Sequence, residues 1–315
     1  MNLRLIDAAS AAYKDLPADD LNRLVFFRSI WGVQAQAIEE AACDYEAPSA
    51  HDLGLCAAKG SAAFKMAPVS VDAALLAKTA AEISECITIK KMLGEEAQAL
   101  LEQLDWEAVI SRLDIAKAGS EPIVFLDLAA QAFLDGGASE FAALTAVNVL
   151  SQALRCQLEK PAQAVVAAYR AAELFEDLHP LTCPCCGAVP SLSHVGGKTS
   201  GQGRGRLLVC SQCGTAWEFE RIRCARCGQQ NPNHLHYFNI EGDDAHRIGT
   251  CDDCGGYMRT LFSEEGDLNP VSYEVEDVVM ARLDALAADP KFHQGQKRSI
   301  EGMTHFVPVT LCVMP

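Results

Sequence analysis

Four copies of the pattern Cys-x-x-Cys-Gly place the strongest constraint on how this chain folds. A glycine after the second cysteine permits a positive φ and lets backbone N–H groups approach a thiolate sulfur. Each copy therefore predicts one half of a metal-binding knuckle. The cysteine pairs are Cys183 and Cys186, Cys210 and Cys213, Cys224 and Cys227, and Cys251 and Cys254, followed by Gly187, Gly214, Gly228 and Gly255.

The pairs also recur at a fixed distance along the chain. Cys183 and Cys224 are 41 residues apart, and so are Cys210 and Cys251. Within each repeat 23 residues separate the two pairs, a length that suits the strand-turn-strand excursion of a four-cysteine ribbon. We predict tandem ribbons, with repeats at 183–213 and 224–254, whose ligands gather within each repeat. Pairing across the connection 214–223 is the alternative.

Four thiolates in a tetrahedron suit zinc or iron, because soft sulfur disfavours magnesium and calcium. A closed set of four ligands also leaves no open position for a substrate water, which indicates a structural or redox role. We therefore predict two metal ions per chain, iron or zinc. The alternative to metal binding is that the four CxxC pairs are unliganded thiols. A thioredoxin-like redox motif is disfavoured because no βαβ pattern surrounds any pair. The predicted metal ligands are Cys183, Cys186, Cys210, Cys213, Cys224, Cys227, Cys251 and Cys254.

Other cysteines and histidines receive weaker predictions. Cys185 lies inside the first knuckle and is expected to be a thiol that does not bind metal. The alternative is that Cys185 serves as a metal ligand in place of a neighbouring cysteine. The isolated cysteines on apolar patterns are expected to be small buried residues; they are Cys43, Cys56, Cys86, Cys156 and Cys312. Five histidines near the knuckles are expected to lie around the sites or at the surface, because each site already has four sulfurs; they are His179, His194, His234, His236 and His246.

Charge and the N-terminal residues bear on compartment and partners. Residues 1–7 place charges in the only span that could serve as a signal sequence, and no run of 18 apolar residues occurs. The 14 cysteines of this 315-residue chain are therefore expected in a reducing compartment, where CxxC pairs hold metal more often than disulfides. A net charge of -16 disfavours nucleic acid and anionic membranes. We predict a cytoplasmic protein with no nucleic-acid partner and no membrane insertion.

The first part of the chain, to about residue 178, is rich in Ala, Leu and Glu and predicts six to eight helices in a packed bundle. Pro17 begins a long amphipathic helix, and Ser70 is a candidate cap for a helix that runs toward residue 92. Pro122 and Ser139 begin two more, and Pro161 is expected to begin the last one.

The helical pattern ends before Pro180, and short β-type runs such as 206–209 and 236–238 then alternate with glycines and cysteines. A helical pattern returns after Pro270. The predicted fold class is α+β: an N-terminal all-α helical domain, a tandem four-cysteine zinc-ribbon or rubredoxin-like metal-binding β domain, and a C-terminal helix. The predicted domains are 1–180, 181–265 and 266–315, the last a helix with a tail.

Arginines near the ribbons are the best evidence for a rival, nucleic-acid-binding interpretation. They are Arg204, Arg206, Arg221, Arg223 and Arg226. Nearby aspartates, such as Asp252 and Asp253, nearly balance them. No Ser-His-Asp, Cys-His or paired-carboxylate arrangement with supporting context stands out, so we predict that the protein is not an enzyme.

The ordered motifs between residues 183 and 288 resemble the formate dehydrogenase accessory protein family, FdhE. The likeness is specific there, whereas the helical half is similar only in architecture. The motifs are Cys183-Pro-x-Cys186-Gly187-x-x-Pro190, Arg206-x-Leu208-x-Cys210-Ser211-x-Cys213, Trp217-x-x-x-Arg221-x-x-Cys224-x-x-Cys227, Leu235-His236-Tyr237-Phe238, Cys251-x-x-Cys254-x-x-Tyr257 and Glu276-Asp277-Val278-Val279.

The resemblance implies a cytoplasmic, chaperone-like maturation factor for a respiratory, molybdopterin-containing formate dehydrogenase. Such a factor binds the catalytic subunit before its export by the twin-arginine route and does not itself oxidise formate. The family's cysteine motifs are associated with bound iron, which makes iron a rival to zinc. The alternatives are an electron- or sulfur-transfer protein that uses ribbon iron and, less favoured, a nucleic-acid-binding zinc ribbon.

Overall fold

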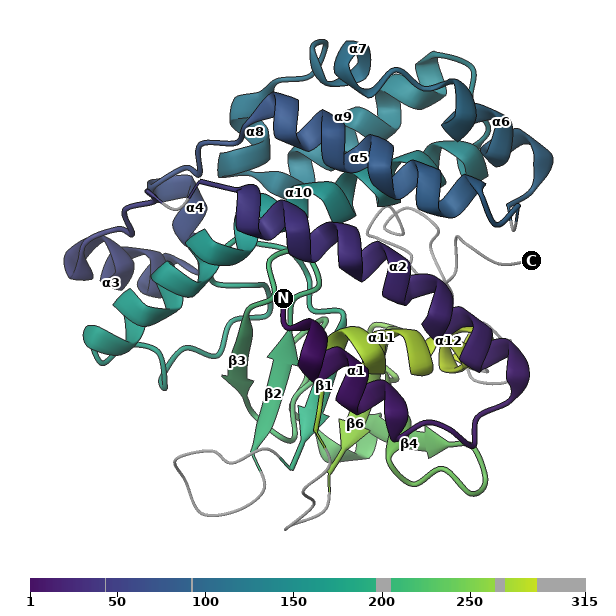
Figure 1. Ribbon diagram of the computed structural model, residues 1–315. Coiled ribbons are helices and arrows are strands. Elements are labelled where there is room, and N and C mark those ends of the chain that lie inside the picture. Colours follow the sequence, from purple (N-terminus) through teal and green to yellow (C-terminus); the bar gives the residue numbers. More distant parts are fainter. Residues whose placement is uncertain (43, 92, 197–204, 264–269, 288–315) are drawn as a thin grey trace.

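The computed structural model describes residues 1–42, 44–91, 93–196, 205–263 and 270–287. Helices form one layer of the molecule and a single sheet lies beneath them (Figure 1). This is the α+β architecture that the sequence predicted. The predicted tail, and most of the glycine-rich segment 201–205, lie outside the described residues. Within the ranges given above, none of the helices is both long and apolar enough to cross a bilayer.

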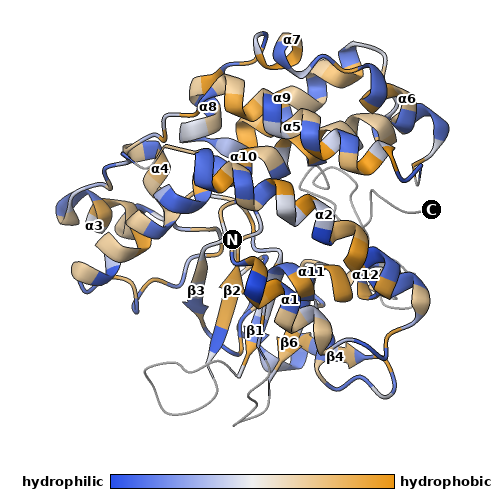
Figure 2. Ribbon diagram, in the orientation of Figure 1, coloured by the Kyte–Doolittle hydropathy of each residue, from blue (hydrophilic) through white to orange (hydrophobic). Residues whose placement is uncertain are grey.

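The helical layer is built around two long helices, α2 and α10, with α5 and α9 packed beside them. Hydrophobic and hydrophilic residues are interspersed along these helices (Figure 2). The apolar residues of α2 do not gather on one stripe, so the amphipathic pattern predicted for that helix is not observed. The described helices before the sheet are α1 (Leu3–Ala11), α2 (Ala18–Glu40), α3 (Ala50–Lys59), α4 (Ala63–Met66), α5 (Ala73–Thr88), α6 (Glu95–Gln103), α7 (Trp106–Ile110), α8 (Ile115–Ser120), α9 (Pro122–Asp135) and α10 (Glu140–Ala171).

Three predicted helix starts are confirmed, and one cap is shifted. Pro17 precedes α2, Pro122 is the first residue of α9, and the Ser139 side chain accepts a hydrogen bond from the N–H of Ala142. The cap of α5 is Asp72 rather than Ser70, because the Asp72 carboxylate accepts from the first free N–H groups of that helix. The layer has more helices than the six to eight expected, since α4, α7 and α8 are too short to show a period.

The prediction that Pro161 begins a helix is wrong, because Pro161 lies inside the 32-residue helix α10. A proline there removes one backbone hydrogen bond and costs about 3 kcal/mol or more. The helix continues because both flanks are packed: its buried residues run from Ala142 to Tyr169. Burial of this length of helix outweighs the local defect.

The two repeats share one six-stranded sheet, in the order β3-β2-β1-β6-β5-β4. Each repeat, taken with the segment that follows it as far as Phe219 or Phe262, contributes three antiparallel strands, and the parallel pairing of β1 with β6 joins the two sets. The predicted β runs are confirmed, since 206–209 is β2 and 236–238 lies in β4. The strands are β1 (Leu192–Val195), β2 (Arg206–Val209), β3 (Ala216–Phe219), β4 (Leu235–Asn239), β5 (His246–Cys251) and β6 (Tyr257–Phe262), and the 3-10 helix η1 (Pro232–His234) precedes β4.

One face of the sheet is covered by the C-terminal helices α11 (Tyr273–Val279) and α12 (Ala281–Ala287). A small apolar core forms between this face and the helices; it contains Leu192, Val209, Ile248, Leu261, Met280, Leu283 and Ala287. Helix α11 in turn contacts α1 and α2, so the two C-terminal helices lie between the sheet and the N-terminal helices (Figure 1).

The main core does not stop at the proposed boundary near residue 180. It extends from helices α2, α5, α9 and α10 into the first repeat, where it takes in Cys183, Cys210 and Trp217. The Trp217 side chain is fully buried and its Nε1–H donates to the carbonyl of Pro180 at 3.0 Å. The first repeat is therefore attached to the helical layer by continuous apolar packing.

Candidate metal centres

The four knuckles share one backbone conformation. The glycine after each pair has a positive φ, namely 80° at Gly187, 77° at Gly214, 81° at Gly228 and 65° at Gly255. In each knuckle that glycine's N–H donates to the carbonyl of the first cysteine, at 2.9–3.0 Å. Backbone N–H groups also reach sulfur, since Arg226 and Gly256 donate to Cys224 Sγ and Cys254 Sγ, each at 3.4 Å. The turn that the glycines predicted is confirmed.

The eight sulfurs gather into two groups of four, and each group belongs to one repeat. Within each group all four sulfurs lie within 4.8 Å of one another. In the first group, the sulfurs of Cys183 and Cys213 are 3.5 Å apart, and so are those of Cys186 and Cys210. The groups are cluster 1, of Cys183, Cys186, Cys210 and Cys213, and cluster 2, of Cys224, Cys227, Cys251 and Cys254.

The spacing of the sulfurs fits a tetrahedral metal centre. Four sulfurs that each lie about 2.3 Å from a central zinc are about 3.8 Å from one another. The distances are 3.8 Å for Cys224 to Cys254 and 3.7 Å for Cys227 to Cys251, and slightly shorter in cluster 1. The donor set and its size therefore suit zinc or iron, and the eight cysteines remain the predicted ligands.

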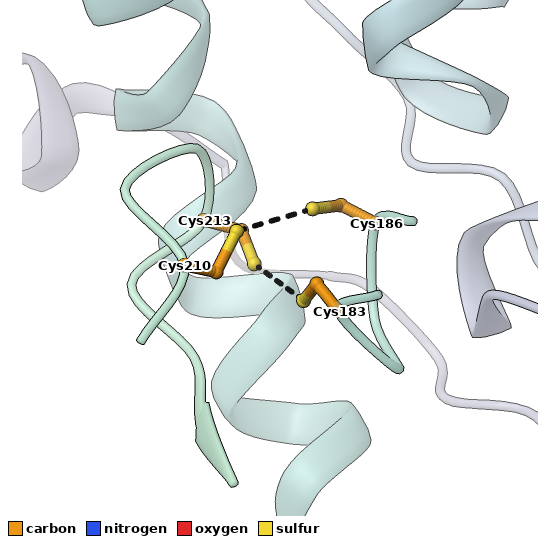
Figure 3. Close-up of side chains that lie close together, drawn as sticks. All are labelled: Cys183, Cys186, Cys210 and Cys213. Atoms are coloured by element: carbon orange, nitrogen blue, oxygen red, sulfur yellow. Dashed lines mark hydrogen bonds between the residues drawn. The ribbon is translucent and has the colours of Figure 1, made fainter. Parts of the chain in front are cut away.

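Cluster 1 is enclosed by the protein. All four of its cysteines are at most 3% exposed. Figure 3 shows the two knuckles meeting beside a helix, with Cys183 and Cys186 from one chain segment and Cys210 and Cys213 from the other. Gln212, inside the second knuckle, accepts from Ser151 Oγ of α10 at 2.7 Å and donates to the Ser151 carbonyl at 3.2 Å.

Cluster 2 is partly open to solvent. Cys224 and Cys251 are buried, but Cys227 and Cys254 are exposed. Its knuckles belong to the second repeat, whose strands form the other half of the sheet from those of cluster 1. The two centres thus have the same donor set in different environments, which gives a bound ion in cluster 2 the easier route to solvent and to other molecules.

Cys185 lies beside cluster 1 but is not one of its four sulfurs. Its Sγ donates to the carbonyl of Ala162 in α10 at 3.7 Å, and its own carbonyl accepts from the N–H of Phe64 at 3.0 Å. Burial raises the pKa of the Cys185 thiol well above its usual value, so the neutral thiol is favoured. This position supports the prediction that Cys185 does not bind metal.

Among the isolated cysteines, Cys56 and Cys156 are buried and Cys86 is half-buried, as expected of small apolar residues. Cys43 and Cys312 lie outside the described residues. The same holds for Arg204, one of the five arginines considered for nucleic acid.

The histidines near the knuckles lie around the clusters and supply none of the eight sulfur ligands. His234 and His236 pair with Asp253 and Asp252 at 2.5 and 2.9 Å. His179 lies near Glu220, and His194 contacts Tyr273 Oη and Ser263 Oγ. These are the surface or surrounding positions that the sequence predicted.

His246 has a structural role that the sequence did not reveal. It is 4% exposed, and its Nδ1 and Nε2 face Asp243 and Glu276 at 2.9 and 3.0 Å. Tyr13, just after α1, donates to Glu276 at 2.7 Å, and Arg282 pairs with Asp243. This buried network joins the N-terminal helix, the second repeat and α11. Residues so distant in the chain give no local signal of such a contact.

The His246 network predicts a pH-dependent stability. Burial lowers the pKa of His246, but hydrogen bonds and charge attraction from Asp243 and Glu276 outweigh burial and raise it to about 9. Because the pKa of His246 is higher in the folded protein, the charged imidazolium stabilises the fold. This stabilisation is complete below pH 6.5, the pKa of histidine in the unfolded chain, and is lost as the pH rises through about 9. His246→Gln should therefore cost up to about 3 kcal/mol at low pH and much less above pH 9.

The measurement is urea unfolding of both proteins across this pH range, and only the difference between them is interpreted. Cysteines, lysines and tyrosines that titrate in the same range and lie away from this network affect both proteins alike. His51→Gln, at an exposed histidine of α3, is the matched control. A His246→Gln deficit that is independent of pH would contradict the assignment.

The helical layer, the shared six-stranded sheet and the two four-cysteine clusters define a tandem cysteine-ribbon protein with an attached helical domain.

A family model described as "FdhE, central domain" matches residues 182–221. "Protein FdhE homolog" of Cronobacter sakazakii is 36% identical over 107 residues, which cover 32% of this chain and 33% of that protein. "Protein FdhE" of Escherichia coli O1:K1 is 35% identical over 105 residues, which cover 33% of this chain and 32% of that one. These matches thus span about a third of the length of the curated relatives.

The fold extends the likeness beyond the cysteine segment. The crystal structure of the FdhE protein from Pseudomonas aeruginosa superposes with a TM-score of 0.57 and 16% identity, covering 98% of this chain and 94% of that one. At this identity the superposition shows the shared fold alone. The shared fold, the family model and the relatives agree with the resemblance to the FdhE family that the motifs indicated.

Proposed function

We propose that this protein is a cytoplasmic accessory factor for a respiratory, molybdopterin-containing formate dehydrogenase. It would bind the catalytic subunit before that subunit is exported and would assist its assembly without oxidising formate itself. The observation that carries the proposal is the pair of four-cysteine clusters in an FdhE sheet, attached to a helical layer of the same family fold. The family name supplies the client, since its members are formate dehydrogenase accessory proteins.

The cysteine clusters support a binding role rather than a hydrolytic one. If each holds zinc or iron, all four positions of the tetrahedron are taken by sulfur, and none remains for a substrate. Cluster 1 would then fix the first repeat against α10, where Gln212 and Ser151 already connect them. A bound ion supplies folding free energy in such ribbons. The clusters would thereby hold the binding surfaces in place.

The test is co-purification of the tagged protein with the catalytic subunit of a formate dehydrogenase from a native-like host. Formate dehydrogenase activity is measured in parallel in a strain that lacks the gene. We expect capture of the subunit and loss of most of the activity, restored by the intact gene. Full activity in the deletion strain, together with no capture, would refute the proposal.

A second function is favoured by one observation, the exposure of Cys227 and Cys254. An iron in cluster 2 would lie close enough to solvent to exchange an electron with a partner, whereas one in cluster 1 would be shielded. Reversible one-electron reduction of the purified iron-loaded protein, lost in Cys254→Ser, would support electron transfer. A protein that contains only zinc would exclude this function, because zinc does not change oxidation state.

A further inference from the structure

The edge strand β4 is the part of the sheet with the least cover. It ends the strand order, so only one of its two edges is paired within the described sheet. Four of its five residues are exposed, and the aromatic side chains of Tyr237 and Phe238 are 42% and 41% exposed. An edge strand of this kind pairs readily with another extended chain.

A cleft of about 220 Å³ opens beside this strand, between the sheet and the knuckle that begins with Cys224. Ile222, Leu235, Tyr237 and Met258 give it apolar walls. The Tyr237 ring lies over Gly249 of β5, where a Cβ would be only 3.0 Å from Tyr237 Cε1. The glycine therefore makes room for the ring, which is held as one fixed wall of the cleft.

Four arginines line the same cleft, and they fall into two pairs. Arg206 and Arg223 form its inner part: both guanidinium groups lie over the Phe219 ring, at 5.5 and 5.0 Å from its centroid. Arg206 is only 5% exposed and donates to the Arg223 carbonyl at 2.7 Å. Its Nε is buried and has no acceptor among the described residues. The inner pair is thus a fixed positive charge.

Arg221 and Arg226 form the outer pair, and both are exposed. Arg223 pairs with Glu220 at 3.0 Å, but neither outer arginine has a carboxylate partner in the part of the chain that the structure describes. The inner pair can balance Glu220 and part of the thiolate charge of cluster 2. The outer guanidinium groups remain available to a ligand, and Ile222, which lines the same cleft, is 57% exposed.

We propose that this cleft and the adjoining face of β4 bind an extended polypeptide segment of the partner that carries acidic and apolar side chains. The inference rests on the proposed function, for which it names the binding surface. Arginine, tyrosine and exposed aliphatic side chains together are typical of the central residues of protein interfaces. No described strand pairs with the outer edge of β4, so an extended segment can align along this strand, and the arginines offer bidentate partners to carboxylates.

The size and charge of the surroundings favour a polypeptide over other ligands. A cleft of about 220 Å³ is smaller than the roughly 300–1,000 Å³ of pockets that enclose a whole small molecule, and it suits a few side chains of a chain passing over it. The net charge of -16 disfavours a nucleic acid, whose phosphates would continue past the arginines onto acidic surface, whereas a short segment can place its few carboxylates at the arginines alone.

The experiment compares the full-length protein with the double variant Arg221→Glu/Arg226→Glu. Immobilised synthetic peptides that combine glutamate with leucine and phenylalanine are the first probe, beside matched peptides in which lysine replaces glutamate. The catalytic subunit of a formate dehydrogenase is the second probe. We expect the protein to prefer the acidic peptides, and the double variant to bind them and the subunit at least about tenfold more weakly. The control Arg4→Glu/Arg112→Glu reverses two exposed arginines of the helical layer and should bind as the original protein does.

Metal content is measured in every variant, since Arg226 lies close to Gly256, whose N–H donates to Cys254 Sγ of cluster 2. If the double variant loses metal, Ile222→Asp supplies the test, because it adds a negative charge to the cleft without changing an arginine. No preference for acidic peptides, unchanged binding by both cleft variants, or RNA binding that the double variant abolishes would overturn the inference. Preference for acidic peptides without capture of the subunit would refute the proposed client and leave the cleft assignment supported.

Discussion

Cys183→Ser should remove about one equivalent of metal and destabilise the whole protein, whereas Cys254→Ser should remove the same amount of metal with a much smaller loss of stability. A serine hydroxyl is a poor ligand for zinc or iron, so either variant leaves an incomplete site. The difference lies in where the two clusters are. Cys183 is 1% exposed and belongs to the main core, while Cys254 is exposed.

Loss of the ion from cluster 1 would leave three buried thiol groups without a metal at the junction with α10. We expect a decrease of several kcal/mol in the free energy of unfolding, a large part of the roughly 5–15 kcal/mol that stabilises a typical domain. The measurements are elemental analysis and urea unfolding followed by helical circular dichroism. Cys86→Ser, at a half-buried cysteine of α5, is the control and should retain both ions. Equal metal loss in all three variants would contradict the ligand assignment.

The cysteine clusters were the most predictable part of this structure, because their signal is local and repeated. A CxxCG pattern specifies a turn within five residues, and the 41-residue offset indicated which pairs gather. The helix starts at Pro17, Pro122 and Ser139 were predictable for the same reason: capping depends on residues within one turn.

Other features depend on contacts between distant residues and give no local signal. A proline within a helical pattern usually marks a helix start or end, so Pro161 was expected to begin a helix. Helix α10 is continuous through Pro161 because the residues on both sides of it are buried, and the local sequence does not show that burial. The parallel pairing of β1 with β6 joins two repeats through strands of four and six residues, and nothing in their composition selects that partner. Cys183 and Cys254 looked alike in sequence, and only packing against α10 makes one cluster buried and the other open.

Arg259 is the clearest buried charge whose role was invisible in the sequence. It lies on β6, is 1% exposed, and donates to the Asp277 carbonyl at 2.8 Å while pairing with the Asp277 carboxylate. Its other carboxylate neighbour, Asp284 of α12, is 3.5 Å away and equally buried. Tyr257 also donates to Asp284 at 2.9 Å. One guanidinium group thus holds both C-terminal helices against the sheet.

Arg259→Met should lower the free energy of unfolding by about 3–5 kcal/mol, because it leaves the Asp284 carboxylate buried without a cation. Burial already raises the pKa of Asp284 to about 6, and the loss of Arg259 would raise it further. The unpaired carboxylate is costly only when charged, so the deficit of the variant should be largest above pH 6 and should shrink as Asp284 becomes protonated. Adding Asp284→Asn to Arg259→Met should recover part of the lost free energy of unfolding, since it removes the unpaired negative charge of Asp284. Urea unfolding at several pH values measures all three proteins, and a deficit below about 1 kcal/mol for the single variant would show that the ion pair does not hold the helices.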